Sequence, residues 1–317
     1  MTTAYVARRL LSALPSVVIV SIIIFSLVRL LPGDVVMARV ADGGFYTQED
    51  LDLIRADLGL DRNFFAQYVT WAGGLLRGDM GTSLWSTNEV TSMIRHSMLL
   101  SIELTLLSML VALAIAIPLG VLSAVKQDSF VDYLARLFSI LGLSIPDFWL
   151  ATMVLLGFSK YVGWLPQFGW FAPWDDPWRN VQALIFPALI IGYRFSAVTA
   201  RMTRSALLEV LREDYVRTAR AKGLREGAVI WRHALRNALI PVITIIGTQV
   251  GFLFGGLVVI EFVFGLPGMG QLTYDAVVRR DYPVVQGTVM VMALVFILAN
   301  LAVDLSYSLL DPRIRYA

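Results

Sequence analysis

The chain has 317 residues, of which 57% are hydrophobic and only 16% are charged, whereas soluble globular domains average about 45–50% apolar and about 25% charged residues. This composition excludes a disordered chain and a soluble enzyme, because so little charge cannot cover a water-exposed surface. A net charge of +2 gives no basic excess for nucleic acid, and with no cysteine there are no disulfides, thiolate metal sites or cysteine nucleophiles. We therefore expect an all-α, polytopic membrane protein.

Six segments are long and apolar enough to be membrane helices. Each needs roughly 20 mostly apolar residues to cross about 30 Å of hydrocarbon. The first follows Arg8 and Arg9 but exceeds the apolar run of a signal peptide, so we interpret it as a retained anchor. Arg194 and Pro187 interrupt the fourth. The predicted spans are Leu10–Val28, Ser97–Val125, Leu137–Phe158, Leu184–Met202, Pro241–Phe262 and Val284–Leu310.

The orientation follows from the distribution of Lys and Arg, which concentrate in cytoplasmic loops. Nine of them lie between Arg201 and Arg236, whereas five are spread over residues 31–96. Both termini are therefore predicted to be cytoplasmic. The predicted regions are an N-terminal anchor helix (1–30), an extracytoplasmic helical insertion (31–96), a core domain of five spans (97–310) and a cytoplasmic tail (311–317).

The extracytoplasmic insertion is predicted to contain two helices. Thr47 is a candidate cap for an amphipathic helix over Gln48–Leu58. A second, apolar and aromatic stretch covers Phe64–Leu76 and ends at the turn Gly78-Asp79-Met80-Gly81. We expect the two helices to form a small subdomain on the membrane face.

The most charged segment of the chain, residues 205–241, lies between the fourth and fifth spans. Lys222 and Gly223 form a good helix stop, and a second short helix is expected over Ala228–Ala238. Two short helices parallel to the membrane and joined at a glycine would form a knob suited to a groove on a partner. The first helix would carry an apolar stripe with i+4 spacing, made of Leu207, Leu211, Tyr215 and Ala219.

Two stretches of this segment resemble the conserved cytoplasmic loop of ABC importer permeases. They read DYVRTARAKGL from Asp214 to Leu224 and HALRNALIP from His233 to Pro241, and the pattern is most similar to the dipeptide/oligopeptide/nickel permease family. Arg217 stands where the general importer pattern has glutamate, and the spacing from Gly223 to Pro241 is longer than in that pattern. Both are variations of the peptide branch, and no role of the glutamate is carried over.

Further motifs resemble the B-type subunit of these importers, and the long first outside segment also favours that subunit over its shorter sister. In chain order, the motifs are Leu31-Pro32-Gly33-Asp34, Gly59-Leu60-Asp61, residues 78–83 (GDMGTS), residues 144–148 (SIPDF) and residues 261–270 (EFVFGLPGMG).

The resemblance implies a transmembrane permease subunit of an ATP-driven, binding-protein-dependent importer of di- and oligopeptides in the prokaryotic plasma (inner) membrane. Its implied partners are a sister permease in a heterodimer, two cytoplasmic ABC ATPases, an extracytoplasmic substrate-binding protein and the lipid bilayer, without nucleic acid. The chain would not be an enzyme and would hold no cofactor, since ATP and Mg²⁺ bind the ATPases. Nickel, glutathione or another small solute are alternative substrates, and an ion-coupled secondary transporter is an alternative class.

The resemblance also implies which residues transmit the ATP-driven motion. Arg217, Arg220 and Arg225 are expected to pair with acidic groups of an ATPase, while Ala219 and Ala221 would permit its close approach. The coupling residues are Asp214, Tyr215, Arg217, Thr218, Ala219, Arg220, Ala221, Lys222, Gly223, Leu224, Arg236, Asn237 and Pro241.

Candidates for the translocation pathway come from charged and polar residues in or near the spans. Arg194 lies nearest the middle of a span, and an ion pair within the bundle or snorkelling are the alternatives to a pathway role. The other pathway candidates are Ser144, Pro146 and Asp147.

Several residues are expected to be structural. Glu103 and Asp304, near span ends, are expected to be solvated or to cap helices, and the Gly251-x3-Gly255 motif is expected to pack helices. The Gly265–Gly270 spacing matches a phosphate-binding loop, but Gln271 and Leu272 replace its Lys and Ser/Thr, so a rigid turn is expected. His233 is expected to pack, and His96 has no neighbour at metal-ligand spacing.

Overall fold

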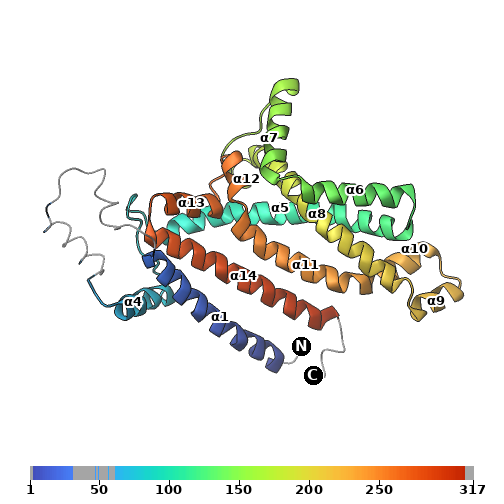
Figure 1. The fold of residues 1–317 in the computed structure, drawn as a ribbon, viewed down its shortest axis with the longest axis horizontal. Coiled ribbons are helices and arrows are strands. Elements are labelled where there is room, and N and C mark those ends of the chain that lie inside the picture. The colour runs from blue at the N-terminus through green and yellow to red at the C-terminus, as the bar shows by residue number, and fades with distance from the viewer. Residues whose placement is uncertain (1–2, 31–46, 48, 50–55, 57–60, 311–317) are drawn as a thin grey trace.

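The computed structural model describes residues 3–30, 47, 49, 56 and 61–310. Long helices run side by side, and one shorter arm projects from them (Figure 1). Among the described residues, β pairing is limited to an isolated bridge between Thr82 and Glu89. The helices, labelled as in Figure 1, are α1 (Thr3–Leu30), α4 (Phe64–Leu76), α5 (Val90–Val125), α6 (Phe130–Ser144), α7 (Asp147–Gly157), α8 (Pro177–Val210), α9 (Asp214–Ala221), α10 (Glu226–Ala228), α11 (Leu235–Gly256), α12 (Val258–Val263), α13 (Met269–Val278) and α14 (Tyr282–Leu310).

Four helical segments are long and apolar enough to cross a membrane, which confirms the all-α membrane class. A fifth candidate is the bent pair Phe130–Ser144 and Asp147–Val162. The apolar part of α1, Leu11–Leu27, is shorter. The total of six spans therefore stays a prediction. The four long segments are Val90–Val125, Pro177–Val210, Glu226–Phe254 and Tyr282–Ser306.

Helices α5 and α8 form the centre of the bundle, and glycines allow their backbones to approach closely. A Cβ atom added to Gly192 of α8 would lie 2.5 Å from Val111 Cγ1 and 2.9 Å from the Ser108 carbonyl oxygen. A Cβ atom added to Gly120 of α5 would lie 2.8 Å from the Ala200 carbonyl oxygen. Close packing therefore explains these two glycines. Around them, the core is filled by fully buried aliphatic side chains, including Leu100, Leu104, Leu184 and Ile191.

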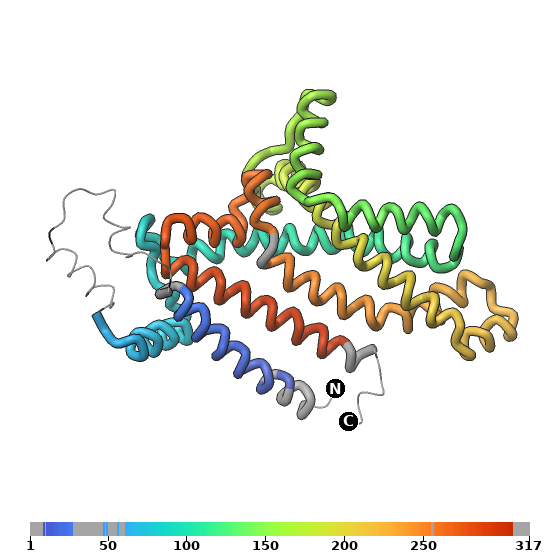
Figure 2. The backbone as a smooth tube through the Cα atoms, viewed as in Figure 1, coloured from blue at the N-terminus to red at the C-terminus, as the bar shows by residue number. Residues whose placement is uncertain are grey.

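The predicted third span, Leu137–Phe158, is not one straight helix. Helix α6 ends at Ser144, and α7 starts at Asp147 with its axis bent by 100° (Figure 2). Ile145 and Pro146 between them have extended backbones, with ψ values of 122° and 137°. Proline disfavours the helical conformation of the residue before it and has no N–H to continue the backbone hydrogen bonds of the helix. The third span therefore stays a prediction, and its helix is divided because hydropathy continues across this dipeptide whereas the helix does not.

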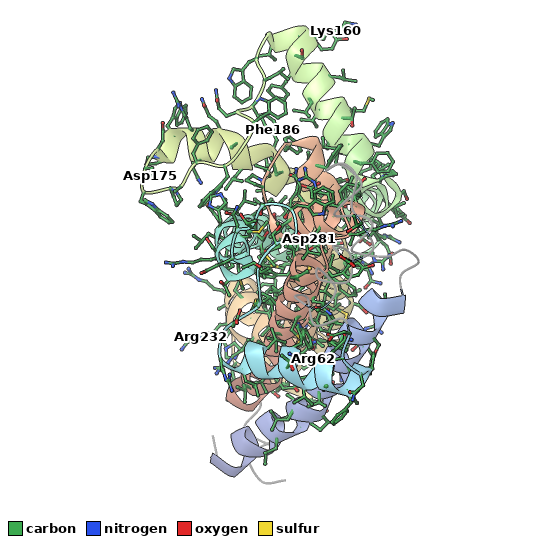
Figure 3. All side chains as sticks on the ribbon, turned by 90° about the vertical axis from the view of Figure 1, so that its left-hand side faces the viewer. Arg62, Lys160, Asp175, Phe186, Arg232 and Asp281 are labelled. Carbon is green, nitrogen blue, oxygen red and sulfur yellow. The ribbon has the colours of Figure 1, made fainter. Side chains whose placement is uncertain are left out.

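Helix α7 and the π-helical turn η1 (Phe158–Val162) form the arm that projects from the bundle, with Lys160 at its far end (Figure 3). The chain then returns to the long α8. Three aromatic rings join the arm to α8: Phe158 lies 4.7 Å from Phe186 between ring centroids, and Trp164 lies 5.9 Å from Phe186. These ring contacts therefore pack the far part of the arm, around η1, against α8.

The two outer helices run in opposite directions, so that α1 begins and α14 ends toward the side of the bundle that carries α9 (Figure 1). Arg9 of α1 and Asp304 of α14 form an ion pair of 2.9 Å, which gives Asp304 a partner other than solvent. Helix α4 lies at the opposite end and has the predicted bounds. Its Tyr68 and Trp71 rings pack on Phe25 of α1.

Some predicted features lie outside the residues that the structure describes, and some helices differ from the predicted spans in length. The Leu31–Asp34 motif, the helix over Gln48–Leu58 and the tail 311–317 lie largely or wholly outside the described residues. Helix α5 begins at Val90, before the predicted second span, and α8 extends beyond both ends of the predicted fourth span. Span five is divided at Leu257 between α11 and α12.

Candidate functional site

The first candidate site is the connection between α8 and α11, at one end of the bundle. Helix α8 ends at Val210, and Glu213 has an extended backbone with a ψ of 148° that starts α9 in a new direction. The segment from Leu207 to Ala219 is therefore two helices rather than the single helix predicted. Helix α9 lies beyond the end of α8, at the edge of the molecule (Figure 1).

One side of α9 is buried against its own chain. Val216 is fully buried and Ala219 is 7% exposed, whereas Tyr215 is 40% exposed. The predicted stripe is interrupted at Tyr215, because the turn after Val210 changes which residues face inward, whereas Leu207 and Ala219 belong to the buried cluster and Leu211 packs against it. Ala219 packs inside the chain, which leaves no room for the close approach of a partner there. The cluster beneath α9 includes Val121, Ala124, Leu207, Val229, Ile230 and Ala234.

Two polar contacts join α9 to the segments that follow it in the chain. The Asn237 side-chain amide donates to the Tyr215 hydroxyl oxygen at 2.7 Å, which joins α9 to α11. Arg220 donates to both carboxylate oxygens of Glu226 at 3.2 and 2.7 Å, and these bonds raise the pKa of the Arg220 guanidinium. Arg220 therefore has a partner within its own chain. Thr218 donates to the Asp214 carbonyl oxygen at 2.9 Å.

The turn after α9 has the predicted form. Helix α9 ends at Ala221, with Lys222 as its C-cap, and Gly223 has a φ of 77°. This left-handed conformation favours glycine because a Cβ atom would be strained there. The turn directs the chain from α9 into the next helical segment while Leu224 and Arg225 stay exposed.

The predicted separate helix over Ala228–Ala238 is part of a longer one. Helix α10 continues through a π-helical segment, η2 (Val229–Ala234), directly into α11. Pro241 lies inside α11 rather than at the start of a new span. Of the two short helices predicted for residues 205–241, α9 is therefore separate and the second is not. A wide π turn places successive side chains differently from an α turn, and such turns are frequent at functional sites.

The outer face of this region is polar and positively charged. Arg217 is also within 3.3 Å of Asp214, but both side chains are largely exposed, and such a pair adds little stability. The exposed cations from α9 to the first turn of α11 are Arg217, Arg220, Lys222, Arg225, Arg232 and Arg236. We call these six residues the α9 basic face.

A buried ion cluster, which the sequence did not reveal, lies behind α9. Asp132, in the first turn of α6, is fully buried. One carboxylate oxygen accepts from Ser123 Oγ of α5 at 2.5 Å and from Arg204 Nε of α8 at 2.8 Å. The other accepts from Arg204 at 2.9 Å, from Arg136 at 2.9 Å and from the Asp128 amide at 3.0 Å. This one carboxylate fastens α5, α6 and α8 close to where α8 leads into α9.

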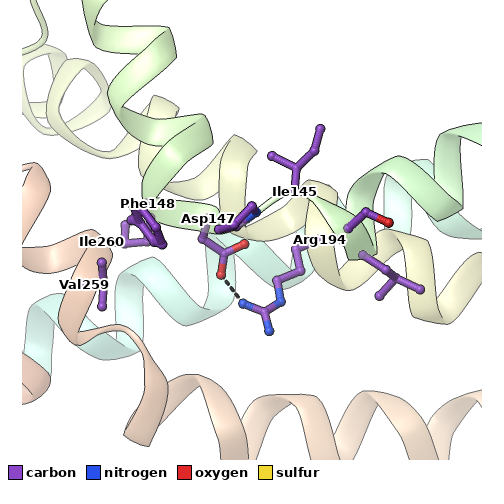
Figure 4. A pocket seen from close by; sticks show the side chains of 9 residues that line it. Ile145, Asp147, Phe148, Arg194, Val259 and Ile260 are labelled. Atoms are coloured by element: carbon purple, nitrogen blue, oxygen red, sulfur yellow. Dashed lines mark hydrogen bonds and ion pairs between the residues drawn. The ribbon is translucent and has the colours of Figure 1, made fainter.

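The second candidate site lies at the α6–α7 break, where a pocket of about 340 Å³ brings together all four predicted pathway residues (Figure 4). Arg194 of α8 forms an ion pair with Asp147, the first residue of α7. The Arg194 side chain is 54% exposed and that of Asp147 is 21% exposed. The pocket is lined by Leu143, Ser144, Ile145, Pro146, Asp147, Phe148, Arg194, Val259 and Ile260.

The turn at residues 265–270 is built around a carboxylate of the chain itself. Glu261 is 1% exposed and accepts from the Gln271 amide at 2.7 Å and from Ser101 Oγ at 3.2 Å. A Cβ atom added to Gly268 would lie 2.1 Å from Glu261 Oε1. The glycine thus makes room for this side chain, which agrees with a rigid structural turn.

Other residues considered from the sequence have structural contacts. The Trp170 indole donates to Glu103 at 2.8 Å, and the His96 ring packs edge-on against that indole. A Cβ atom added to Gly251 would lie 2.5 Å from Phe296 Cδ2, as expected for a helix-packing glycine. Within the described residues, no three acidic, His or Cys side chains are grouped as metal ligands would be.

Together, apolar helices, a charged pocket and an exposed basic helix define a membrane transport protein. A family model for the inner membrane component of binding-protein-dependent transport systems matches residues 116–316, and a model for the N-terminal part of such components matches residues 2–105. The chain belongs to this family, whose members are the membrane permease subunits of ABC importers.

Curated relatives match the chain over nearly its full length. It is 40% identical to the dipeptide transport system permease protein DppB of Alkalihalophilus pseudofirmus, with 99% of each chain covered. It is 42% identical to the glutathione transport system permease protein GsiC of Pectobacterium atrosepticum, covering 98% of this chain and 99% of that one. A putative peptide transport system permease protein of Brucella melitensis is 40% identical over both full lengths.

Proposed function

We propose that this chain is the B-type permease subunit of an ATP-driven importer of short peptides. The dipeptide and peptide permeases among its relatives support this substrate class, and glutathione, itself a small peptide, is the alternative that another relative supports. The chain would form the translocation pathway as one half of a heterodimer with a sister permease. An extracytoplasmic binding protein would deliver the peptide, and two cytoplasmic ATPases would bind ATP and Mg²⁺.

The α9 basic face is the observation on which this proposal mainly rests. We propose that it is the surface that contacts an ATPase subunit. Helix α9 is rigidly mounted, because Val216 and Ala219 are buried beneath it and Asn237 holds Tyr215 at its side. Its other side displays cations to solvent. A helix fixed on one side and charged on the other fits a complementary acidic groove of a partner.

A displacement of α9 would be transmitted to the membrane-spanning helices through direct side-chain contacts. The cluster below it includes residues of α5, α8, η2 and α11, so that a displacement of α9 moves these helices together. Asp132 joins the same end of α5 and α8 to α6. In the proposed cycle, closure of the ATPase pair shifts α9 and rotates the helices, which opens the pathway alternately to the two sides of the membrane.

The proposed orientation places α9 and both termini in the cytoplasm and residues 31–96 outside. The dense positive charge around α9 supports this arrangement. In the same orientation, α4 lies at the extracytoplasmic end of the bundle. The pocket at the α6–α7 break, between the two ends, is then the proposed part of the translocation pathway.

Charge reversal on the α9 basic face tests the proposal. The double substitution Lys222→Glu and Arg225→Glu should lower ATP-dependent peptide uptake by about tenfold or more, because opposed like charges would replace attraction at the ATPase surface. The measurement is uptake by the complete importer in proteoliposomes, together with the amount of ATPase that co-purifies. Both residues are exposed, so the fold should be unaffected.

The matched control is Arg77→Glu, an exposed cation at the end of α4 on the opposite end of the bundle. This control should retain uptake and ATPase binding. Normal uptake in the double variant at normal membrane levels would rule out an ATPase contact at α9.

A further inference from the structure

The charged pair in the α6–α7 pocket needs an explanation beyond folding. Arg194 lies within the long apolar segment Pro177–Val210, where a charge is costly and usually functional. Asp147 pairs with the Arg194 guanidinium, yet more than half of the Arg194 side chain stays exposed. In Figure 4 the two side chains meet across the pocket, one from α8 and the other from the start of α7. The pair is therefore formed but open to a molecule in the pocket.

The pocket offers a separate contact for each part of a short peptide. The planar guanidinium of Arg194 matches a carboxylate with two parallel hydrogen bonds. The Asp147 carboxylate matches an ammonium group. The apolar side chains of Ile145, Phe148, Val259 and Ile260 line the remaining wall.

We infer that the Arg194–Asp147 pair recognises short zwitterionic peptides by exchanging its internal ion pair for two pairs with the peptide ends. The C-terminal carboxylate binds Arg194 and the N-terminal ammonium binds Asp147. This inference rests on the proposed function, because it assumes that peptides pass this pocket. It adds a selection step inside the permease for molecules that carry both charges.

Exchange of ion pairs explains why such a site needs both residues. A peptide with two charged ends leaves neither Arg194 nor Asp147 unpaired when it opens the internal pair. A peptide with one blocked end would leave one of them without a partner in a partly desolvated place, which is strongly unfavourable. Since the internal pair re-forms when the peptide leaves, binding stays weak enough for transport.

The size of the pocket agrees with a short substrate. A volume of about 340 Å³ lies at the small end of ligand sites, which span about 300–1,000 Å³. The charged ends of an extended dipeptide are separated by roughly 7 Å, or two residue lengths. A modest separation of α7 from α8 would therefore admit it between the two side chains.

The test compares dialanine, N-acetyl-dialanine and dialanine amide as substrates of the complete importer in proteoliposomes. The affinity of the binding protein for each peptide is measured separately, and each variant is compared with the unaltered permease using the same binding protein. Arg194→Gln should lower uptake of the two peptides with a free carboxylate by roughly tenfold or more and affect the amide much less. Asp147→Asn should lower uptake of the two peptides with a free ammonium and affect the N-acetyl form much less.

Two further variants exclude a merely structural effect. Arg201→Gln removes an exposed cation from the same helix outside the pocket and should leave all three uptake rates unchanged. Arg194→Lys keeps the charge but loses the bidentate geometry, and should give an intermediate loss with the same preference. The amount of assembled complex and its basal ATP hydrolysis serve as readouts of folding.

Equal losses for all three peptides in Arg194→Gln and Asp147→Asn would overturn this inference, because the pair would then act only as a structural lock. Unchanged uptake of all three would overturn it as well. Both outcomes leave the proposed function intact. Failure of the unaltered importer to take up any peptide with ATP would instead contradict the proposed function itself.

Discussion

Replacing Gly223 with valine is expected to lower ATP-driven uptake by about tenfold or more while the chain still assembles in the membrane. The φ of 77° at Gly223 is unfavourable for any residue with a Cβ atom and most of all for a β-branched one. A Cβ atom there would meet no atom within 4 Å, so the core is not disturbed. The penalty of about 1–2 kcal/mol falls on the turn itself, which would change its path and displace α9.

Uptake and ATP hydrolysis by the reconstituted importer measure this effect, with the amount of chain in the membrane as a reference. Gly223→Asn is the matched control, because asparagine adopts the left-handed conformation more easily than other residues. It should retain most of the uptake, whereas Gly223→Val should lose about tenfold or more, corresponding to about 1.4 kcal/mol or more of lost coupling. Equal uptake by the valine variant and the unaltered chain would show that the turn has no role in coupling.

The largest loss of stability is expected for Asp132→Asn. The carboxylate of Asp132 is fully buried and accepts hydrogen bonds from Ser123, Arg136 and Arg204. Removing its charge leaves the partly buried Arg204 cation uncompensated, and breaking a buried pair in this way costs about 3–5 kcal/mol. Because 21% of the Arg204 side chain is exposed, we expect the lower end of this range. The free energy of unfolding in detergent, or the midpoint of thermal unfolding, measures the loss.

The neighbouring Asp128 gives a control with the same chemical change. Its side chain is 69% exposed and lies 3.6 Å from Arg136, so the pair is weak. Asp128→Asn should therefore change the free energy of unfolding by about 0.5 kcal/mol or less. Similar midpoints for the two variants would mean that the buried cluster does not fasten α5, α6 and α8.

The general architecture was predictable because hydropathy and charge act over single segments. Apolar runs of sufficient length predicted the helices that form the bundle, and Lys222-Gly223 predicted the end of α9. The motif between Asp214 and Pro241 pointed to the importer permease family, which the matching family models confirm. Each of these signals is local in the sequence, so one chain is enough to detect it.

The errors arose where the backbone changes direction inside an apolar or amphipathic run. Pro146 was visible, but nothing local indicated whether it would kink the third span gently or divide it by 100°. The turn after Val210 has no glycine or proline to mark it, so the apolar spacing suggested one continuous helix. In the same way, η2 joins α10 to α11 although the sequence suggested a separate helix.

The buried Asp132 cluster and the Arg194–Asp147 pair could not be derived from sequence spacing. Asp132 and Arg204 are 72 residues apart, and Asp147 and Arg194 are 47 residues apart. Only the packing of α6 and α7 on α8 brings them together. The sequence offered one local signal for the Asp132 cluster, which is the spacing of four residues between Asp132 and Arg136. This spacing is common on exposed helices, so it does not indicate a buried cluster.

The location of α9 on the cytoplasmic side, in contact with an ATPase, is tested most directly by labelling a single cysteine introduced as Lys222→Cys. The chain has no cysteine of its own, so the label reports this position alone. A maleimide that cannot cross membranes should react in inverted vesicles stripped of ATPase, react much less when the ATPases are bound, and fail to react in intact cells. Reaction in intact cells, or equal reaction with and without bound ATPase, would contradict the account.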